Sequence, residues 1–202
     1  MALVQNSATQ NRSDGVTSNS HSHTITAGAN VVFAIVLLDY GSGGMAVTYG
    51  GTAMILIGSA RDATFIYRLL NPASGAQTVA ASWTTGRSSS VIAVDFSGAH
   101  ATDPDGTPAT ATGSTTTPTV NVASVNAGDI VIGAESQESG VTTAVGAGQT
   151  SFDANNFPGK GSTETGTGTV THSYTIASGV NWSIVAFSVL AAPSGGGPVW
   201  WF

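Results

Sequence analysis

The sequence predicts an all-β protein, a two-sheet antiparallel β-sandwich of the jelly-roll-like kind with extended N- and C-terminal arms. Short segments alternate apolar and polar residues with a period of two, and no long segment has the 3.6-residue period of a helix. The 26 glycines, together with prolines and asparagines, punctuate these segments where turns need them. A length of 202 residues suits one undivided β-domain.

The alternating segments are expected to be strands at residues 23–26, 31–39, 46–49, 52–57, 63–70, 77–83, 89–97, 117–122, 129–135, 167–176 and 182–190. The last of these is apolar on both faces, because Trp182 and Ile184 alternate with Val185 and Phe187. Such a strand is expected at the centre of a sheet or under a neighbouring layer. Residues 99–116 and 136–162 are expected to be long loops.

Three regions follow from this pattern: an N-terminal arm at 1–19, the sandwich domain at 20–192, and a Gly/Pro linker with an aromatic tail at 193–202. Leaving large aromatic side chains in water forgoes roughly 1.5–3 kcal/mol of burial each, and aromatic clusters are frequent interface anchors. The predicted interface residues are Val199, Trp200, Trp201, Phe202, Leu3 and Val4. The alternative is a tail that folds back on its own domain.

Charge is sparse. Charged residues make up 8% of the chain, against about 25% in an ordinary domain, which suggests a surface partly covered by partner chains. The net charge is −6, and the five basic residues form no stripe, so direct nucleic-acid binding is not expected. The chain has no cysteine, which excludes disulfides and thiolate metal sites.

The N-terminal residues have neither the basic start nor the apolar stretch of a signal peptide. The apolar run at 31–38 is far too short to span a membrane. We therefore expect synthesis in the cytoplasm, with release by lysis, by a dedicated secretion route or inside a particle.

Several motifs occur in order along the chain: SHTITAGAN at 22–30, VTYGGTAM at 47–54, YRLLNP at 67–72, SGAQTV at 74–79 and FSGA at 96–99. Over residues 20–190 they resemble a module of phage virion proteins and secreted bacterial surface proteins. The resemblance implies a jelly-roll-like sandwich, as in decoration proteins, head fibres and tail-associated receptor proteins. It supplies no catalytic motif. A chain without a second large domain favours a stand-alone virion subunit.

Two groups of residues have metal-binding alternatives. His21 and His23 have strand spacing and would share one face, but no third ligand is evident, so polar residues at a strand start are the simpler interpretation. His100 and His172 are isolated. The segment DPDG at 103–106 resembles half of a calcium loop, whose other ligands are absent in register, or is an Asp-Pro turn in an exposed loop. No metal or cofactor is predicted.

Two further groups have catalytic or sugar-binding alternatives. Glu135 and Glu138 could act as a glycosidase carboxylate pair or be solvated side chains. Strand aromatics could form a sugar-stacking platform or belong to the core; they are Trp83, Trp182, Tyr40, Tyr49, Tyr67 and Tyr174.

These observations predict a structural phage virion protein, a capsid decoration (cement) or head-fibre subunit, and not an enzyme. Expected partners are copies of the chain, for which a trimer is one arrangement, and virion proteins such as the major capsid protein. The alternative is a carbohydrate-binding or adhesion module of a tail fibre or bacterial surface protein, with surface glycans as partners and an extracellular location. A hydrolase is a third hypothesis with little support.

Overall fold

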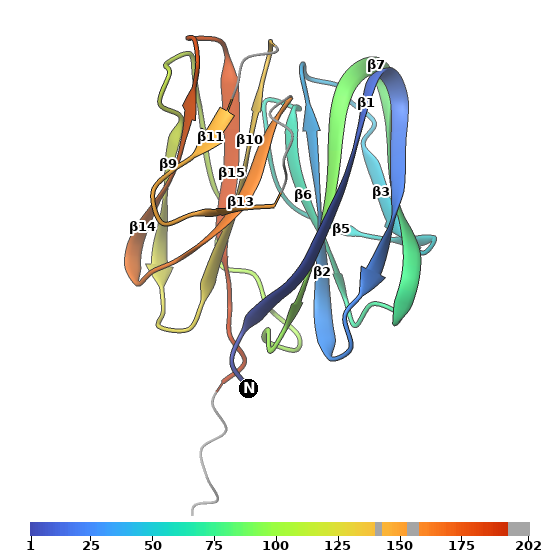
Figure 1. The fold of residues 1–202 in the computed structure, drawn as a ribbon, viewed down its shortest axis with the longest axis vertical. Coiled ribbons are helices and arrows are strands. Elements are labelled where there is room, and N and C mark those ends of the chain that lie inside the picture. The colour runs from blue at the N-terminus through green and yellow to red at the C-terminus, as the bar shows by residue number, and fades with distance from the viewer. Residues whose placement is uncertain (140–142, 153–157, 194–202) are drawn as a thin grey trace, which may run out of the picture.

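The computed structural model describes residues 1–139, 143–152 and 158–193, and it confirms an all-β fold of antiparallel sheets. Its strands are β1 (Val4–Ile25), β2 (Ala29–Leu38), β3 (Ala46–Tyr49), β4 (Thr52–Ala53), β5 (Ile55–Ala60), β6 (Thr64–Leu70), β7 (Gly75–Ser97), β8 (Ala109–Gly113), β9 (Thr119–Val125), β10 (Ile130–Gln137), β11 (Thr143–Val145), β12 (Thr150–Ser151), β13 (Gly159–Thr165), β14 (Gly168–Ile176) and β15 (Trp182–Val189). Strands β1–β7 lie on one side of the molecule and β8–β15 on the other (Figure 1). The described chain contains no helix of the length and apolarity needed to cross a bilayer.

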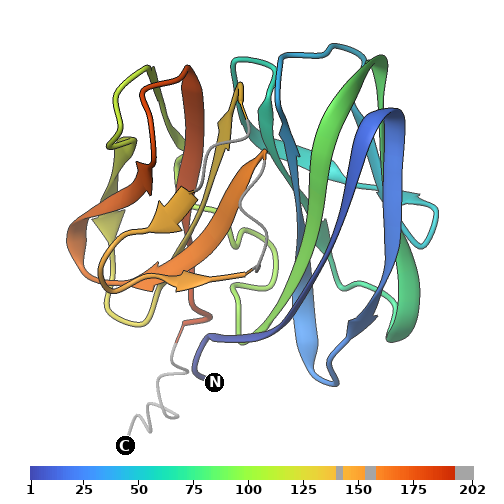
Figure 2. The same cartoon turned by 45° about the horizontal axis from the view of Figure 1, so that its top comes forward.

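The largest sheet is built on two long strands. Strands β1 and β7 have 22 and 23 residues and pair with each other along most of their lengths. The first part of β7 also pairs with β3 and the second part with β2, so one strand belongs to two parts of a strongly curved, nearly closed, barrel-like sheet (Figure 2). The fold thus differs from a plain two-sheet sandwich, since five- and three-stranded sheets complete it.

The segments expected to be irregular contain strands. Residues 4–19, predicted as part of an arm, are paired with β7 inside the main sheet. The predicted loop at 99–116 contains β8, and the predicted loop at 136–162 contains β11, β12 and the start of β13. These strands are rich in Ser, Thr, Gly and Asn and lack apolar alternation. Their backbone pairing with neighbouring strands, which a local pattern does not encode, decides their structure.

Three apolar cores lie side by side. On β2, Val31, Phe33 and Ile35 face the central core between the two sides of the molecule, and the alternating Val32 and Ala34 face the core inside the β1–β7 sheet. On β15, Val185 and Phe187 face the central core, whereas Ile184 and Ala186 face the third core, between β15 and the sheet of β9 and β14. Burial of both faces of β15 confirms its predicted central position.

The strand pairing of β1–β7 recurs in β8–β15. Strand β2 lies between β6 and the second part of β7, as β10 lies between β13 and β15. The first part of β7 lies between β3 and β1, as β14 lies between β11 and β9. The second part of β7 pairs with β1, as β15 pairs with β8. We call β1–β7 the N-terminal unit and β8–β15 the C-terminal unit.

Equivalent turns support this correspondence. Before β2, the Ala29 amide donates to the Thr26 carbonyl at 3.0 Å, with Gly28 at φ 88°. Before β10, the Asp129 amide donates to the Asn126 carbonyl at 3.1 Å, with a glycine in the same left-handed region between them. The central core is therefore the contact between corresponding faces of two similar units.

Candidate functional site

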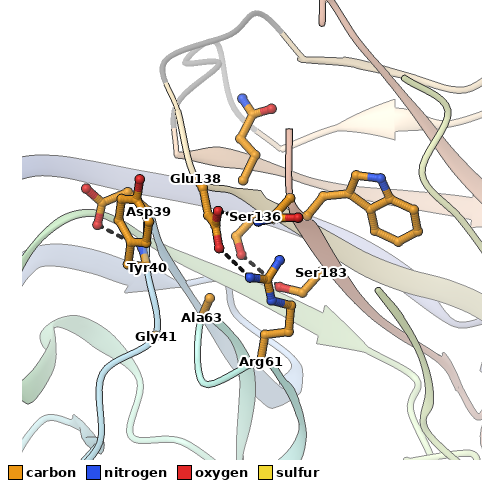
Figure 3. Close-up of a pocket in the computed structure, with 11 residues that line it drawn as sticks. Asp39, Tyr40, Gly41, Arg61, Ala63, Ser136, Glu138 and Ser183 are labelled. Carbon is orange, nitrogen blue, oxygen red and sulfur yellow. Dashed lines mark hydrogen bonds and ion pairs between the residues drawn. The ribbon is translucent and has the colours of Figure 1, made fainter. Parts of the chain in front are cut away.

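A polar groove lies where the two units meet at one end of the molecule (Figure 3). Its walls come from the residues after β2, the turn before β6, the end of β10 and the start of β15. A narrow pocket opens beside a wider hollow. Tyr40, Glu138 and Asn181 line both, so we treat them as one site and call it the end groove.

The end groove is built from corresponding parts of the units. The Asp39 amide donates to the Ser88 carbonyl at 3.1 Å, and the Glu138 amide donates to the Asn181 carbonyl at the same distance. Asp39 directly follows β2, and Glu138 directly follows β10. Each unit thus contributes one carboxylate from the end of its central strand.

Glu138 is the hub of the polar contacts. Its carboxylate forms an ion pair with Arg61 of the other unit, and its second oxygen accepts a 2.7 Å hydrogen bond from the Asn181 amide group. The side chains of Arg61 and Glu138 are 34% and 23% exposed, so both remain accessible from the groove. Arg61 and Asp62 occupy the left-handed region, with φ of 52° and 50°, which non-glycine residues seldom adopt. This turn directs Arg61 across the unit boundary.

Tyr40 forms the open side of the groove. It is 47% exposed. The guanidinium carbon of Arg87 lies 5.6 Å from the centre of its ring, within the range of a cation–π contact. Arg87 is in turn held by the Gly41 carbonyl, to which it donates at 2.9 Å. The ring therefore has one supported face.

Hydroxyl groups form the floor of the groove. Thr64 Oγ1 lies 2.7 Å from Ser136 Oγ and 2.8 Å from Ser183 Oγ, which are 3.0 Å apart. All three residues are buried. The cluster satisfies its own hydrogen bonds and joins β6, β10 and β15 below the opening.

Away from the groove, each unit brings a hydroxyl, a buried imidazole and a carboxylate together. In the N-terminal unit, Thr9 Oγ1 lies 2.8 Å from His23 Nδ1, and His23 Nε2 lies 3.3 Å from Asp95 Oδ1. Burial by itself would raise the pKa of Asp95, but contacts with His23, Ser7, the Thr26 amide and Asn6 outweigh it and lower the pKa well below its usual range. Asp95 is therefore an ionised carboxylate inside the unit. Its proximity also helps burial raise the pKa of Tyr49 to about 12.

In the C-terminal unit, Ser162 Oγ lies 2.9 Å from His172 Nε2, and His172 Nδ1 lies 3.4 Å from Glu164 Oε2. Burial lowers the pKa of His172, which keeps the imidazole neutral, and the imidazole lowers the pKa of Glu164 despite opposing desolvation. Tyr174 closes the set with its hydroxyl 3.1 Å from Ser162 Oγ.

Both sets have the composition of a nucleophile–base–acid triad. His23 and Asp95 have 0% exposure in the first set, where Thr9 is half-buried, and Ser162 and His172 have 0% exposure in the second. A substrate must reach the nucleophile, and no pocket described here is lined by Thr9 or Ser162. We assign both sets a structural role.

The predicted interface residues have different positions. Leu3 is 8% exposed and packs in the central core, because the start of β1 runs along the boundary between the units. Val4 is 47% exposed. Val199, Trp200, Trp201 and Phe202 lie outside the described residues.

The predicted metal alternatives find little support. His21 and His23 do share one face, and each contacts Thr9 Oγ1 through one ring nitrogen. His21 Nε2 lies 3.0 Å from this oxygen and His23 Nδ1 lies 2.8 Å from it. No cluster of three potential ligands occurs within residues 1–139, 143–152 and 158–193. In the segment at 103–106, Asp105 forms an ion pair with Arg68, and both side chains are nearly buried, whereas Asp103 is exposed, so the predicted turn is exposed at Asp103 and packed at Asp105.

The carboxylate pair is divided between two environments. Glu138 faces the end groove, but Glu135 is wholly buried beside Thr143, which donates to its carboxylate at 3.4 Å. Burial raises the pKa of Glu135 to about 8. The two carboxylates do not share a cleft. The predicted aromatic platform is mostly core, since every member is buried except Tyr40.

Comparisons with protein-family models, curated proteins and solved structures found no match for this chain. The site therefore rests on its own geometry. Sequence patterns did not single out Asp39, Arg61 or Asn181 as groove residues. The scarcity of basic residues could have drawn attention to Arg61, which is one of only five in the chain.

Proposed function

We propose that this chain is a structural subunit of a phage particle, in the decoration or head-fibre class, which acts through contacts with neighbouring subunits. The observation that carries the assembly part of the proposal is strand β5. It forms one edge of the main sheet, pairing there with β6, and its Ile55 and Leu56 are 59% and 47% exposed. An apolar edge without charge or proline offers backbone groups and side chains to another chain.

The finer fold belongs to the same proposal. We describe each unit as a small jelly-roll-like sandwich, and the support is that the β10–β15 and β9–β14 sheets enclose a common apolar core. The three apolar cores of the molecule make it a rigid body, which suits a mechanical role. The resemblance of residues 20–190 to virion modules supports placement in a particle.

The two described ends of the chain lie close together, which supports anchoring of the subunit from one end. The Ala192 amide donates to the Gly98 carbonyl at 2.8 Å, and Gly98 lies against the backbone of Ala2. The segments leading to both terminal regions therefore leave the body at one place (Figure 1). Anchoring by the tail residues 199–202 and by Val4 would act from this end.

Self-association tests the edge contact. A Leu56→Lys variant should shift purified protein from an oligomer toward monomer in analytical ultracentrifugation, because it places a charge on the apolar edge. Thr52→Lys on the other edge strand, β4, is the matched control, since Thr52 is also exposed. A wild-type protein that stays monomeric over the whole concentration range would contradict the proposal.

Particle occupancy tests the anchoring end. Deletion of residues 199–202 should lower the amount of the protein that mass spectrometry detects in purified virus particles. Unchanged occupancy and unchanged oligomer mass would show that the tail has no such role.

A further inference from the structure

The exposed aromatic ring of Tyr40 is the first indication that the end groove binds a ligand. Trp83, Trp182, Tyr49 and Tyr67 are at most 6% exposed, whereas Tyr40 is 47% exposed. An aromatic ring left in water forgoes roughly 1.5–3 kcal/mol of burial. Arg87 holds the Tyr40 ring from 5.6 Å, so the ring is supported while its remaining surface stays open.

The polar side chains of the groove are already held in position. Glu138 uses one carboxylate oxygen for Arg61 and the other for Asn181, at 2.7 Å. Carboxylate, amide and guanidinium groups are planar and have several donor or acceptor positions, so each can bind a ligand hydroxyl while keeping its internal contact. Fixing these groups before binding lowers the entropy cost of recognition.

The charge balance selects the chemical class. Of the charged side chains that line the groove, Arg61 is basic and Asp39 and Glu138 are acidic; Arg87, which holds the Tyr40 ring, supplies the second positive charge nearby. A nearly neutral groove with paired charges gives no excess attraction for phosphate or sulfate. Hydroxyl-rich, neutral ligands with an apolar ring face fit both the aromatic surface and the planar polar groups.

We infer that the end groove is a binding site for neutral or N-acetylated oligosaccharides, with Tyr40 as the stacking surface and Glu138, Asn181 and Arg61 as hydrogen-bonding residues. The adjoining hollow, which Ser114 and Ser139 also line, widens the site beside Tyr40.

The position of the groove fits a surface-binding role. It lies at the Leu38 end of β2, and the first and last described residues of the chain lie near the Ala29 end, where Ala29 pairs with Ser97. Ten residues of strand separate these ends by about 30 Å. If the protein is anchored by its termini, the groove faces outward; this orientation alone rests on the proposed function.

An array of neutral and N-acetylated oligosaccharides, followed by calorimetric titration with the best-bound one, tests the inference. We expect Tyr40→Ala and Asn181→Ala each to weaken binding by about tenfold or more. Thr52→Ala, which shortens an exposed side chain on β4 away from the groove, should leave the affinity unchanged. Thermal unfolding of each variant checks that the fold is retained.

The inference is overturned if the array retains no oligosaccharide, or if folded Tyr40→Ala binds as tightly as the wild type. A monomer that binds oligosaccharide through Tyr40 would overturn only the proposed assembly role. An oligomer that binds none would overturn only the oligosaccharide site.

Discussion

The two units share a strand framework but enclose different interiors. The N-terminal unit surrounds a large apolar core, beside which His23 and the ionised carboxylate of Asp95 are buried. The C-terminal unit surrounds a smaller apolar core and a row of buried polar residues that includes Ser162, His172 and Glu135. Equivalent positions show the contrast: Val36 on β2 pairs with Val91, whereas Glu135 on β10 pairs with Ile184.

This difference shows which part of the molecule is constrained. The faces that meet in the central core are apolar in both units over most of their area, because each must cover the other. The face turned into each unit can carry different chemistry, provided that its polar groups find partners. The shared framework therefore depends on strand pairing and on the central core more than on either interior.

The largest effect is expected in the central core. Phe33 has 0% exposure, and its ring centre lies 5.8 Å from that of Phe96 and 5.4 Å from that of Phe187 in the other unit. Phe33→Ala should lower the free energy of unfolding by about 3–5 kcal/mol through a cavity. Ile132→Val, at the corresponding position of β10, should cost about 1 kcal/mol.

Urea denaturation followed by tryptophan fluorescence measures both. If the units depend on their contact, Phe33→Ala should shift one cooperative transition to lower urea. Two separate transitions in the wild type would show that the units fold independently.

The next effect distinguishes the two interiors. Asp95 accepts hydrogen bonds from the amides of Ser7 and Thr26, at 3.1 Å each, and from the Ser7 hydroxyl. Asp95→Ala should destabilise the protein by about 3 kcal/mol, since several buried donors lose their acceptor. The corresponding Ser188→Ala in β15 should change stability by less than about 1 kcal/mol. Equal losses in both variants by urea denaturation would contradict the contrast between the interiors.

The pH dependence of Asp95 has a definite sign. Its pKa is lower in the folded state than in the unfolded chain, so its contribution to stability is present above the unfolded-state pKa near 4 and is lost as the pH falls further.

The pH dependence of the other unit has the opposite sign. Because burial raises the pKa of Glu135 to about 8, the folded protein retains a proton that the unfolded chain releases near pH 4.5. Stability should therefore fall as the pH rises from about 4.5 to about 8. Glu135→Gln, which stays neutral, should remove this decline.

Urea denaturation at several pH values between 5 and 9 measures the slope, and Glu138→Gln in the exposed groove is the control. An identical slope in the wild type and in Glu135→Gln would rule out this assignment.

Local sequence patterns predicted the central strands well. The alternation at 182–189 correctly indicated a strand buried on both faces, and the apolar run at 31–38 lies within β2. Polar residues at 4–19 did not predict β1, because its place in the sheet comes from pairing with β7 and not from its own apolar face. The repeated architecture also went unpredicted, although Thr26–Ala29 and residues 126–129 form matching turns.

The candidate site was less accessible to sequence reasoning. Glu138 was identified as a potential functional carboxylate, and Tyr40 as one of six potential sugar-stacking aromatics. Neither its partner Arg61 nor Asn181 is near Glu138 in the chain, and the ion pair between Arg61 and Glu138 crosses 77 positions. Contacts of this kind depend on how the two units pack.

The sequence alone determined the β class, the identity of the central strands and the scarcity of charge, since these depend on local periodicity and composition. Only the tertiary structure decided that the strands form two similar units, that Asp95 and Glu135 occupy unlike interiors, and that Tyr40, Arg61 and Glu138 meet at one groove. The physical reason is that burial and charge pairing arise between strands distant in sequence. Their consequences for pKa and binding exist only once those strands are packed.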